Sequence, residues 1–295
     1  MNLRNIENWP AEWTSALQRE GELLIEQAFQ EDLNGLGDVT SQAIFKDDAV
    51  KTARIFAREA GTAAGLFMVE RVFAVRETSI QVQFLKRDGD AVKPAETLLR
   101  VTGPVSALLT AERTALNFLG RLSGIATLTQ KFTQAVSGTG TKILDTRKTT
   151  PGWRFLEKYA VRQGGGTNHR MGLFDRVLIK DNHIQAAGGI RHAVQAVRDY
   201  FSSRGLSLPI EVEVRNLTEL KEALGQPIQQ IMLDNMDAET ISHAVKLVSG
   251  RVPLEASGGV TLETVRKIAE TGVDFISVGA LTHSAPALDV SMLTQ

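Results

Sequence analysis

The sequence predicts an α/β protein of two domains, an N-terminal α+β domain followed by a barrel-like (β/α) domain with about six parallel strands. Two patterns predict this. Apolar and polar residues alternate over residues 80–84, as in a strand that is exposed on one face of an antiparallel sheet. After Gly140, short apolar stretches alternate with helical stretches, as in a parallel sheet. The 295 residues are enough for two domains of ordinary size.

The first domain begins with a helix candidate and continues as a sheet. Apolar side chains recur at helical spacing over residues 13–32, until Asn34-Gly35 breaks the pattern. The sheet candidates are residues 53–57, 80–84 and 98–101. Gly103-Pro104 ends this region, and the pattern predicts a long helix from Val105 to Val136.

Six strand candidates follow in the second domain. They lie at residues 142–144, 176–179, 210–214, 230–233, 252–255 and 274–278, with helix candidates such as 238–248 and 262–271 between them. A full eight-fold barrel needs two more strands. We therefore expect a barrel that is incomplete or of lower order.

Composition excludes several classes of protein. Thirty-three basic and 34 acidic side chains leave a net charge of −1, which argues against a protein that wraps nucleic acid. Residues 142–180 hold nine Lys or Arg and three Asp or Glu, a local excess of +6 against −7 elsewhere. The chain has no cysteine, which excludes disulfides, thiolate metal sites, iron–sulfur clusters and a cysteine nucleophile.

The beginning of the chain argues for a soluble, cytoplasmic protein. Glu7, Trp9, Pro10 and Glu12 interrupt the region where a signal peptide has an apolar core. The longest uncharged apolar run, residues 63–69, is far shorter than the ~20 residues that span a bilayer. We therefore expect no membrane partner.

Basic residues stand directly after the strand candidates of the second domain. A run of charges is most often a solvated helix face, but apolar strands fix the direction of Arg147, Lys148 and Lys180. The carboxyl ends of parallel strands share one face of a barrel, where active sites are built. With His169 and Arg170 from a nearby loop, these cations suit an anionic ligand, either a carboxylate or a phosphate.

Acidic and glycine residues complete this face. Ser257-Gly258-Gly259 and Gly279-Ala280 follow the last two strands, where backbone N–H groups of barrels often bind phosphate, although such glycines also make tight turns. Glu213 and Asp234 could bind sugar hydroxyls or a hard cation such as Mg²⁺, or pair with Lys148 and Lys180.

The residues alone leave three classes of function open. The carboxyl ends of the strands form a rim on this face of the barrel, and an enzyme whose ligand carries both carboxylate and sugar phosphate fits the residues of this rim best. Lys180 after a barrel strand could instead be a Schiff-base lysine of a lyase. A sugar-phosphate binder without catalysis is the third class.

Motifs along most of the chain resemble the quinolinate phosphoribosyltransferase family. Asp145-Thr146-Arg147-Lys148-Thr149-Thr150-Pro151-Gly152 carries the resemblance most clearly, with further motifs at residues 31–32, 37–41, 111–117, 123–127, 164–170, 179–183, 233–236, 255–259 and 277–283. The resemblance implies an N-terminal open sandwich over residues 1–127, completed by residues 279–295, and a catalytic α/β-barrel domain over residues 128–278.

The resemblance also implies an activity, in which phosphoribosyl passes from phosphoribosyl pyrophosphate to quinolinate with loss of CO₂ and pyrophosphate. The product would be nicotinate mononucleotide, at the entry to NAD synthesis. Mg²⁺ is the implied cofactor. A related transferase for another acceptor acid is the nearest alternative.

The same resemblance implies a role for each residue of the rim. Quinolinate would be bound by Arg113, Thr146, Arg147, His169, Arg170 and Lys180. The phosphoribosyl group would be bound by Lys148, Glu213, Asp234, Ser257, Gly258, Gly259, Gly279 and Ala280. Lys148, Glu213 and Asp234 would be catalytic, and the two carboxylates would engage the metal. Arg113 matches an arginine that enters the site from the second subunit of a homodimer, and higher assembly stays open.

Overall fold

The computed structural model describes residue 7, residues 9–45 and residues 49–295. The chain divides into two compact units. The first comprises Met1–Gln130, Thr149–Gly165 and Ala280–Gln295, and the second comprises Lys131–Lys148 and Gly166–Gly279. Thr149–Gly165 therefore belongs with the first unit, although it lies inside the range 128–278 that we expected for the barrel domain.

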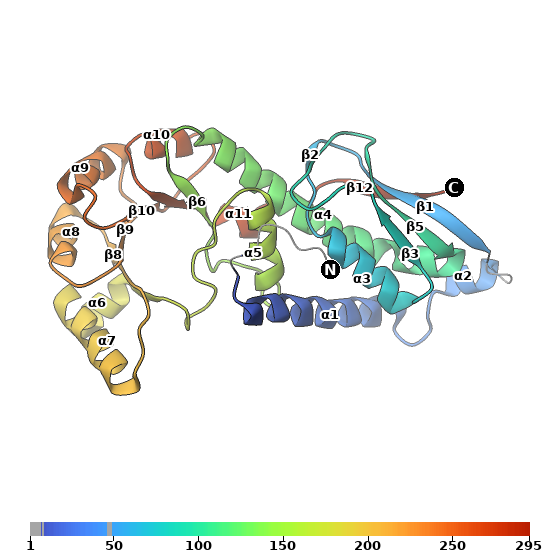
Figure 1. The fold of residues 1–295 in the computed structure, drawn as a ribbon, viewed down its shortest axis with the longest axis horizontal. Coiled ribbons are helices and arrows are strands. Elements are labelled where there is room, and N and C mark those ends of the chain that lie inside the picture. Colours follow the sequence, from blue (N-terminus) through green and yellow to red (C-terminus); the bar gives the residue numbers. More distant parts are fainter. Residues whose placement is uncertain (1–6, 8, 46–48) are drawn as a thin grey trace. The chain divides into compact units, whose positions relative to one another are not determined.

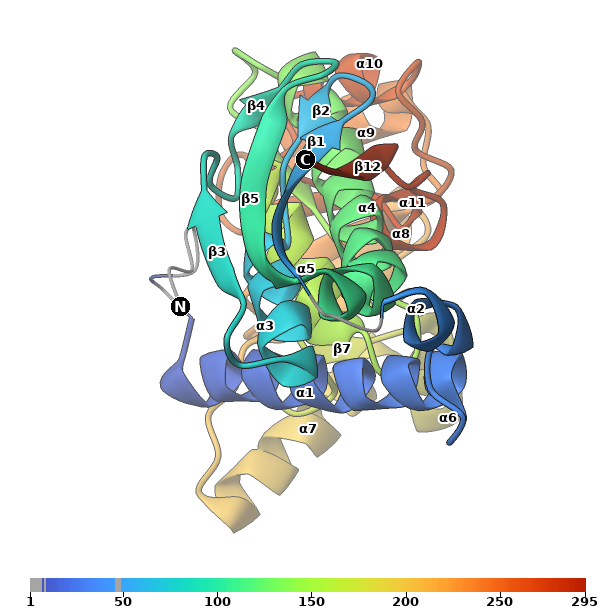
Figure 2. The same cartoon turned by 90° about the vertical axis from the view of Figure 1, so that its right-hand side faces the viewer.

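The first unit contains an antiparallel sheet with the strand order β12-β1-β5-β3 (Figure 2). The strands are β1 (Val50–Ala57), β3 (Gln81–Phe84), β5 (Thr97–Pro104) and β12 (Val290–Thr294), and β2 (Gly61–Thr62) pairs with β4 (Ala91–Val92). Ala53, Ile55 and Ala57 of β1 are fully buried and alternate with more exposed residues. This alternation gives the sheet the apolar face that its helices cover.

Six helices of the described residues belong to this unit. They are α1 (Ala11–Leu33), α2 (Val39–Ile44), α3 (Leu66–Arg76), α4 (Val105–Ala135, which continues to Gln130 in this unit), α5 (Arg154–Gln163) and α11 (Ala280–His283). The predicted ranges of α1 and α4 are correct to within two residues at either end. The short strand β12 follows α11, so the end of the chain returns to the sheet beside β1.

The C-terminal tail crosses α4 at a glycine. A Cβ on Gly124 would lie inside van der Waals contact with the carbonyl oxygen of Pro286. One turn earlier, the backbone N–H of Leu288 donates to the carbonyl of Gly120 at 2.9 Å. The close passage of the tail therefore depends on the absence of a side chain at residue 124.

Two buried acids fix α5 within the first unit, which explains why Thr149–Gly165 departs from the barrel. Glu157 is fully buried and accepts hydrogen bonds from Arg121 Nη2 at 2.6 Å and from Thr150 Oγ1 at 2.9 Å. Asp88 accepts the Tyr159 hydroxyl proton at 2.6 Å. These contacts bind the helix to α4 and to the turn before β4.

The second unit is built on a six-stranded parallel sheet with the order β6-β11-β10-β9-β8-β7 (Figure 1). The strands are β6 (Lys142–Leu144), β7 (Val177–Ile179), β8 (Ile210–Val214), β9 (Gln230–Asp234), β10 (Leu254–Ser257) and β11 (Phe275–Ser277). The helices are α6 (Asp181–Ala187), α7 (Ile190–Arg204), α8 (Leu217–Leu224), α9 (Ala238–Val248) and α10 (Val265–Ala269). The predicted fold class, with six parallel strands in the second half of the chain, is confirmed.

Most strand and helix ranges agree with the sequence, and two do not. The strand predicted at residues 252–255 begins at Leu254, because Pro253 has no N–H to donate to a sheet. The helix predicted at residues 262–271 spans only Val265–Ala269, and the preceding residues form turns. In the part of the chain that the structure describes, no helix is both long and apolar enough to cross a membrane.

Candidate active site

The carboxyl ends of the six strands bring the predicted residues of the second unit to one rim. Ser257 is paired with Asp234 at the ends of β10 and β9, and Glu213 with Met232 in β8 and β9. The residues that follow or end the six strands in chain order are Thr146, Arg147, Lys148, Lys180, Glu213, Asp234, Ser257 and Gly279. Arg113 is exposed on α4 and Ala280 begins α11, so both belong to the first unit.

Lys180 and Glu213 form an ion pair on this rim. Lys180 Nζ lies 3.3 Å from Glu213 Oε2, and the Glu213 side chain is only 9% exposed. Pairing with Lys180 is one of the roles that the sequence left open for Glu213, and the structure contains this pair.

Two arginines place positive charge close together. Arg170 is buried, and its Nη1 donates to the carbonyl of Arg176 at 3.2 Å. Burial lowers the pKa of the Arg170 guanidinium, and the charge of Arg147 lowers it further. Both effects disfavour the charged form, and an anion between the two arginines would offset the repulsion between them.

A buried aspartate holds the loop that carries Arg170. Asp145 follows β6 and is fully buried; it accepts the backbone N–H of His169 at 2.9 Å and the Asn168 side-chain amide at 2.6 Å. Thr167 pairs with Leu144 at the edge of β6. Asp145 therefore fixes the segment after Gly166 against the first strand of the rim.

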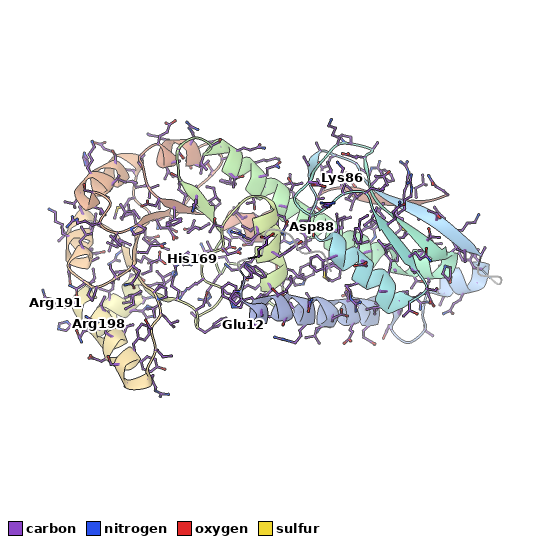
Figure 3. The ribbon with its side chains drawn as sticks, viewed as in Figure 1. Glu12, Lys86, Asp88, His169, Arg191 and Arg198 are labelled. Atoms are coloured by element: carbon purple, nitrogen blue, oxygen red, sulfur yellow. The ribbon has the colours of Figure 1, made fainter. Side chains whose placement is uncertain are left out.

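His169, labelled in Figure 3, is buried, and both of its ring nitrogens face polar groups. Nε2 lies 3.1 Å from Glu211 Oε2 and 3.4 Å from Glu255 Oε2, and Nδ1 accepts the Arg170 N–H at 2.6 Å. Burial lowers the pKa of His169, but hydrogen bonds to Glu211 and Glu255 outweigh burial and raise it to about 9. The two carboxylates thus favour the cationic ring, which is protonated on both nitrogens. The N–H of Arg170 instead favours the neutral ring, in which Nδ1 carries no proton. Nε2 bears a proton in both forms.

The interior of the sheet contains polar residues that the sequence interpretation missed. Gln230 Nε2 donates to Glu211 Oε1 at 3.0 Å and to Glu255 Oε2 at 2.7 Å, while Arg176 Nη1 donates to Gln230 Oε1 at 2.9 Å. Burial raises the pKa of Glu255, whereas His169 and Arg176 keep the pKa of Glu211 low despite its burial. The negative charge of the network therefore lies mainly on Glu211.

A signal for this network stands in the sequence of β8. Residues 210–214 read Ile-Glu-Val-Glu-Val, and all five are buried. Acidic residues at alternate positions of a fully buried strand face the opposite side from the valines. Such a strand needs buried partners for its carboxylates, and Gln230 and His169 are those partners.

Two groups of side chains offer metal ligands. His169, Glu211 and Glu255 have donor atoms within 4.8 Å of one another. Nε2 of His169 faces the two carboxylates, and a metal bound there would have to displace a proton from the ring. Glu213 and Asp234 offer carboxylate oxygens on the neighbouring strands β8 and β9, the ligand type that Mg²⁺ prefers. Mg²⁺ prefers oxygen ligands, so the chemistry of the second pair suits Mg²⁺ better than a group that includes a histidine.

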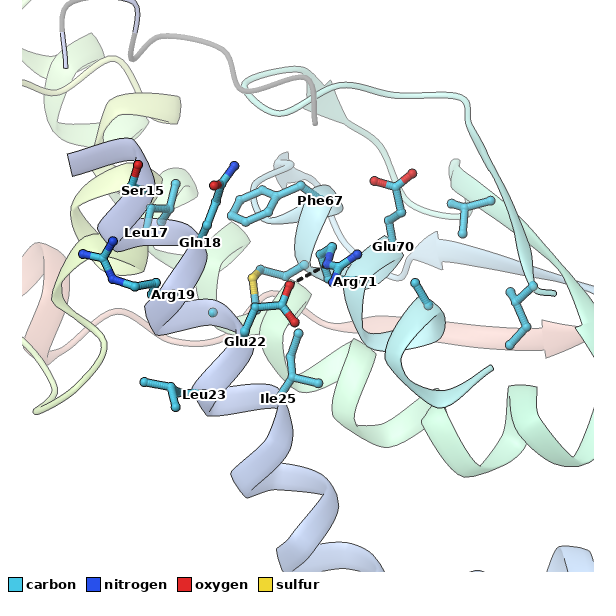
Figure 4. Close-up of a pocket in the computed structure, with 15 residues that line it drawn as sticks. Ser15, Leu17, Gln18, Arg19, Glu22, Leu23, Ile25, Phe67, Glu70 and Arg71 are labelled. Atoms are coloured by element: carbon cyan, nitrogen blue, oxygen red, sulfur yellow. Dashed lines mark hydrogen bonds and ion pairs between the residues drawn. The ribbon is translucent and has the colours of Figure 1, made fainter. Parts of the chain in front are cut away.

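A cavity of about 930 Å³ lies elsewhere, in the first unit (Figure 4). It is lined by residues of α1, α3 and β3 with Ile80, and the Arg71 side chain donates to Glu22 at 2.7 Å on its wall. None of the residues predicted for the active site lines it. Its size therefore does not mark it as the site of the rim chemistry.

Both parts of the chain match known families. Residues 38–123 match the N-terminal domain of quinolinate phosphoribosyl transferase, and residues 125–293 match its C-terminal domain. The probable nicotinate-nucleotide pyrophosphorylase [carboxylating] of Bacillus subtilis is 44% identical over 269 residues, which are 91% of this chain and 91% of that protein. A protein of the same name, from Arabidopsis thaliana chloroplasts, is 45% identical over 91% of this chain and 81% of its own length.

A solved structure agrees with these matches over nearly the whole chain. The nicotinate-nucleotide pyrophosphorylase of Francisella tularensis is 42% identical and covers 94% of this chain and 96% of its own, with a TM-score of 0.89. The likeness includes both units, so the two-part architecture is shared.

Proposed function

The chain belongs to the quinolinate phosphoribosyl transferase family, and we propose that it transfers phosphoribosyl from phosphoribosyl pyrophosphate to quinolinate. The products are nicotinate mononucleotide, CO₂ and pyrophosphate, which places the reaction in NAD biosynthesis. The relatives named as nicotinate-nucleotide pyrophosphorylases support this proposal.

One observation carries the proposal at the level of the site. The Arg170 guanidinium is buried, the positive charge of Arg147 acts on it, and Lys180 lies on the same rim. A dianionic acid with adjacent carboxylates would relieve the repulsion between these cations. Arginine can bind a carboxylate through two parallel hydrogen bonds, which also fixes the plane of the ring.

We assign the quinolinate half of the site to Thr146, Arg147, Arg170 and Lys180. His169 is included as an orienting and charge-balancing residue, because its ring nitrogens face Glu211, Glu255 and the Arg170 backbone. This arrangement does not require His169 to shuttle a proton.

The phosphoribosyl half is assigned to Lys148 after β6 and to the ends of β8, β9, β10 and β11, which lie between β6 and β7 in the sheet. Lys148 would bridge quinolinate and pyrophosphate, Glu213 and Asp234 would face the ribose, and the turns at residues 257–259 and 279–280 would bind the 5′-phosphate. Glu213 and Asp234 would also hold Mg²⁺, which when bound stabilises the negative charge of pyrophosphate. Backbone N–H groups at a glycine turn suit phosphate because nothing blocks the approach of the backbone.

The chemistry needs charge stabilisation more than proton transfer. The bond between ribose C1′ and pyrophosphate breaks as the pyridine nitrogen, which already has a lone pair, forms its bond to C1′. Glu213 and Asp234 can stabilise the positive charge that develops on the ribose, and Lys148 the negative charge that leaves. The cationic ring then accepts the electrons of the departing 2-carboxylate, CO₂ leaves, and C2 takes a proton.

We also propose that the protein acts as a homodimer in the cytoplasm, with Arg113 entering the partner's site. The exposure of Arg113 on α4 is compatible with this role. No other residue of the first unit is assigned to quinolinate.

Acceptor choice tests the proposed function. The protein is incubated with phosphoribosyl pyrophosphate, Mg²⁺ and either quinolinate or nicotinate, and pyrophosphate release is followed. Turnover of quinolinate alone is expected. Turnover of nicotinate alone would identify a transferase for another acid. If neither acid leads to pyrophosphate release, only a sugar-phosphate binder remains. Borohydride trapping of a carbonyl substrate on Lys180 would indicate the lyase.

A further inference from the structure

The backbone of Asn235 is left-handed, directly after Asp234. Its φ is +54°, a conformation that costs most residues energy and that asparagine tolerates better than others. Among the described residues, the other non-glycine positions with positive φ are Asn34, Ala95 and Ser249, and none of these follows a strand of the parallel sheet. The turn at Asn235 ends β9 at the carboxylate that we assign to the ribose.

The Asn235 side chain binds that carboxylate. Its Nδ2 donates to Asp234 Oδ2 at 2.9 Å. Its backbone N–H donates to the carbonyl of Ser257 at 2.8 Å, one register position beyond the pairing of Asp234 with Ser257. Asn235 therefore bonds to the ends of two neighbouring strands, β9 and β10.

Asn235 also packs against the glycine turn after β10. A Cβ on Gly258 would overlap the Oδ1 and Cγ atoms of Asn235. Gly258 has a φ of +101° and Gly259 a φ of +60°, conformations that glycine adopts without strain. The amide of Asn235 thus occupies the space that any side chain at residue 258 would take.

We propose that Asn235 is a positioning residue for phosphoribosyl pyrophosphate. Its amide orients the Asp234 carboxylate, and its contact with Gly258 sets the distance between that carboxylate and the phosphate turn. The inference rests on the proposed function, because it takes Asp234 and residues 257–259 as the two ends of the phosphoribosyl site. A carboxylate held by a neighbouring amide does not have to be ordered when the ligand binds, which strengthens binding.

Two substitutions distinguish the effect of the Asn235 side-chain amide from the effect of its left-handed backbone. Asn235→Gly keeps the left-handed turn at no steric cost and removes the amide, whereas Asn235→Ala removes the amide and also strains the turn. Ser249→Gly is the matched control, because Ser249 has a φ of +49° at the end of α9 and is not part of the rim.

Calorimetry with phosphoribosyl pyrophosphate and Mg²⁺ tests the proposal. Loss of a hydrogen bond to a partly exposed carboxylate predicts that Asn235→Gly weakens binding by about threefold to tenfold, and Asn235→Ala by at least as much. The KM for quinolinate at saturating phosphoribosyl pyrophosphate and the melting temperature of Asn235→Gly should stay at their wild-type values. Ser249→Gly should bind like the wild type.

The outcomes distinguish this inference from the function on which it rests. Wild-type affinity in Asn235→Gly would overturn the positioning role and leave the proposed function intact. An equal loss for phosphoribosyl pyrophosphate and quinolinate would also overturn it, since the effect would then be a general disturbance of the rim. A wild-type protein that binds no phosphoribosyl pyrophosphate would overturn both.

Discussion

At the scale of single residues, the rim separates positive from negative charge. Arg147 and Arg170 stand on one part of it, and Glu213 and Asp234 lie on neighbouring strands of another. Lys180 connects the two, since it follows β7 and pairs with Glu213. This distribution of charge is the one that the proposed reaction of an acceptor acid with a cationic ribosyl group would need.

Substitution of Arg170 should affect one substrate only. Arg170→Ala is expected to weaken quinolinate binding by ~1.5–3 kcal/mol, the usual contribution of a hydrogen bond to a charged group, while phosphoribosyl pyrophosphate binding is retained. Steady-state KM values for the two substrates measure this. Arg198→Ala on the exposed face of α7 removes the same charge and should change neither value. Comparable losses for both substrates would refute the carboxylate role of Arg170.

Sequence patterns located the rim residues and missed those beneath them. Apolar strands precede Arg147 and Lys180, and Asp234 is the last residue of such a strand. The end of each strand in the sequence therefore predicted where these residues lie. Glu211 and Glu255 lie inside strands, where the role of an acidic residue can be inferred only from the side chains that contact it in the folded protein. Those partners, Gln230 and His169, lie 19 and 42 residues from Glu211 in the chain, and no local spacing connects them.

At the scale of elements, α5 illustrates how a segment can leave the domain that its sequence position suggests. Glu20 of α1 lies at the N-terminal end of α5, where its side-chain oxygen Oε1 accepts a hydrogen bond from the Leu156 N–H at 3.2 Å. Burial raises the pKa of Glu20 from 4.5 to about 7, although this hydrogen bond acts in the opposite direction. Nothing in the order of strands and helices along the sequence predicts that α5 packs with α1.

The pKa of Glu20 predicts a pH dependence of stability. Between pH 4.5 and 7 the folded protein holds a proton that the unfolded chain releases, so the free energy of unfolding falls as pH rises through this window. Glu20→Gln should flatten this part of the curve and raise the melting temperature at pH 8. Melting temperatures from pH 4 to pH 8 test it, with the exposed Glu26→Gln as control. A Glu20→Gln curve parallel to the wild type would contradict the assignment.

The crossing of α4 by the tail predicts an unusual effect of alanine. In a helix, Gly→Ala ordinarily stabilises by up to ~1 kcal/mol. Gly124→Ala should instead destabilise by ~1–3 kcal/mol, because the new methyl group meets the Pro286 carbonyl. Thermal unfolding measures the change, and Gln134→Ala on the exposed part of α4 should be nearly neutral. A more stable Gly124→Ala protein would show that the tail does not pass there.

At the scale of the whole molecule, the charge excess of residues 142–180 divides between the two units. Arg154, Lys158 and Arg162 belong to α5 in the first unit, and the other six cations of this range belong to the second. The rim thus carries fewer of these charges than the sequence pattern suggested. A small anionic acid needs only the few that remain there.

A dimer that shares its sites makes a prediction for mixed assemblies. Arg113→Ala and Lys148→Ala chains should each be inactive as homodimers. Their heterodimer should regain one intact site of two, because one site receives an unchanged Arg113 and an unchanged Lys148. Activity after subunit exchange measures this, and native mass spectrometry shows whether heterodimers form. Heterodimers without recovered activity would exclude a role for Arg113 across the interface.

Labelled carboxylates test the central proposal, decarboxylating phosphoribosyl transfer to quinolinate, most directly. Quinolinate labelled in the 2-carboxylate, or in a second sample in the 3-carboxylate, is incubated with the protein, phosphoribosyl pyrophosphate and Mg²⁺, and labelled CO₂ and pyrophosphate are measured together. We expect equal amounts of both, no label released from the 3-carboxylate, and no CO₂ without phosphoribosyl pyrophosphate. Pyrophosphate release without CO₂, or CO₂ release without phosphoribosyl pyrophosphate, would contradict the proposed reaction.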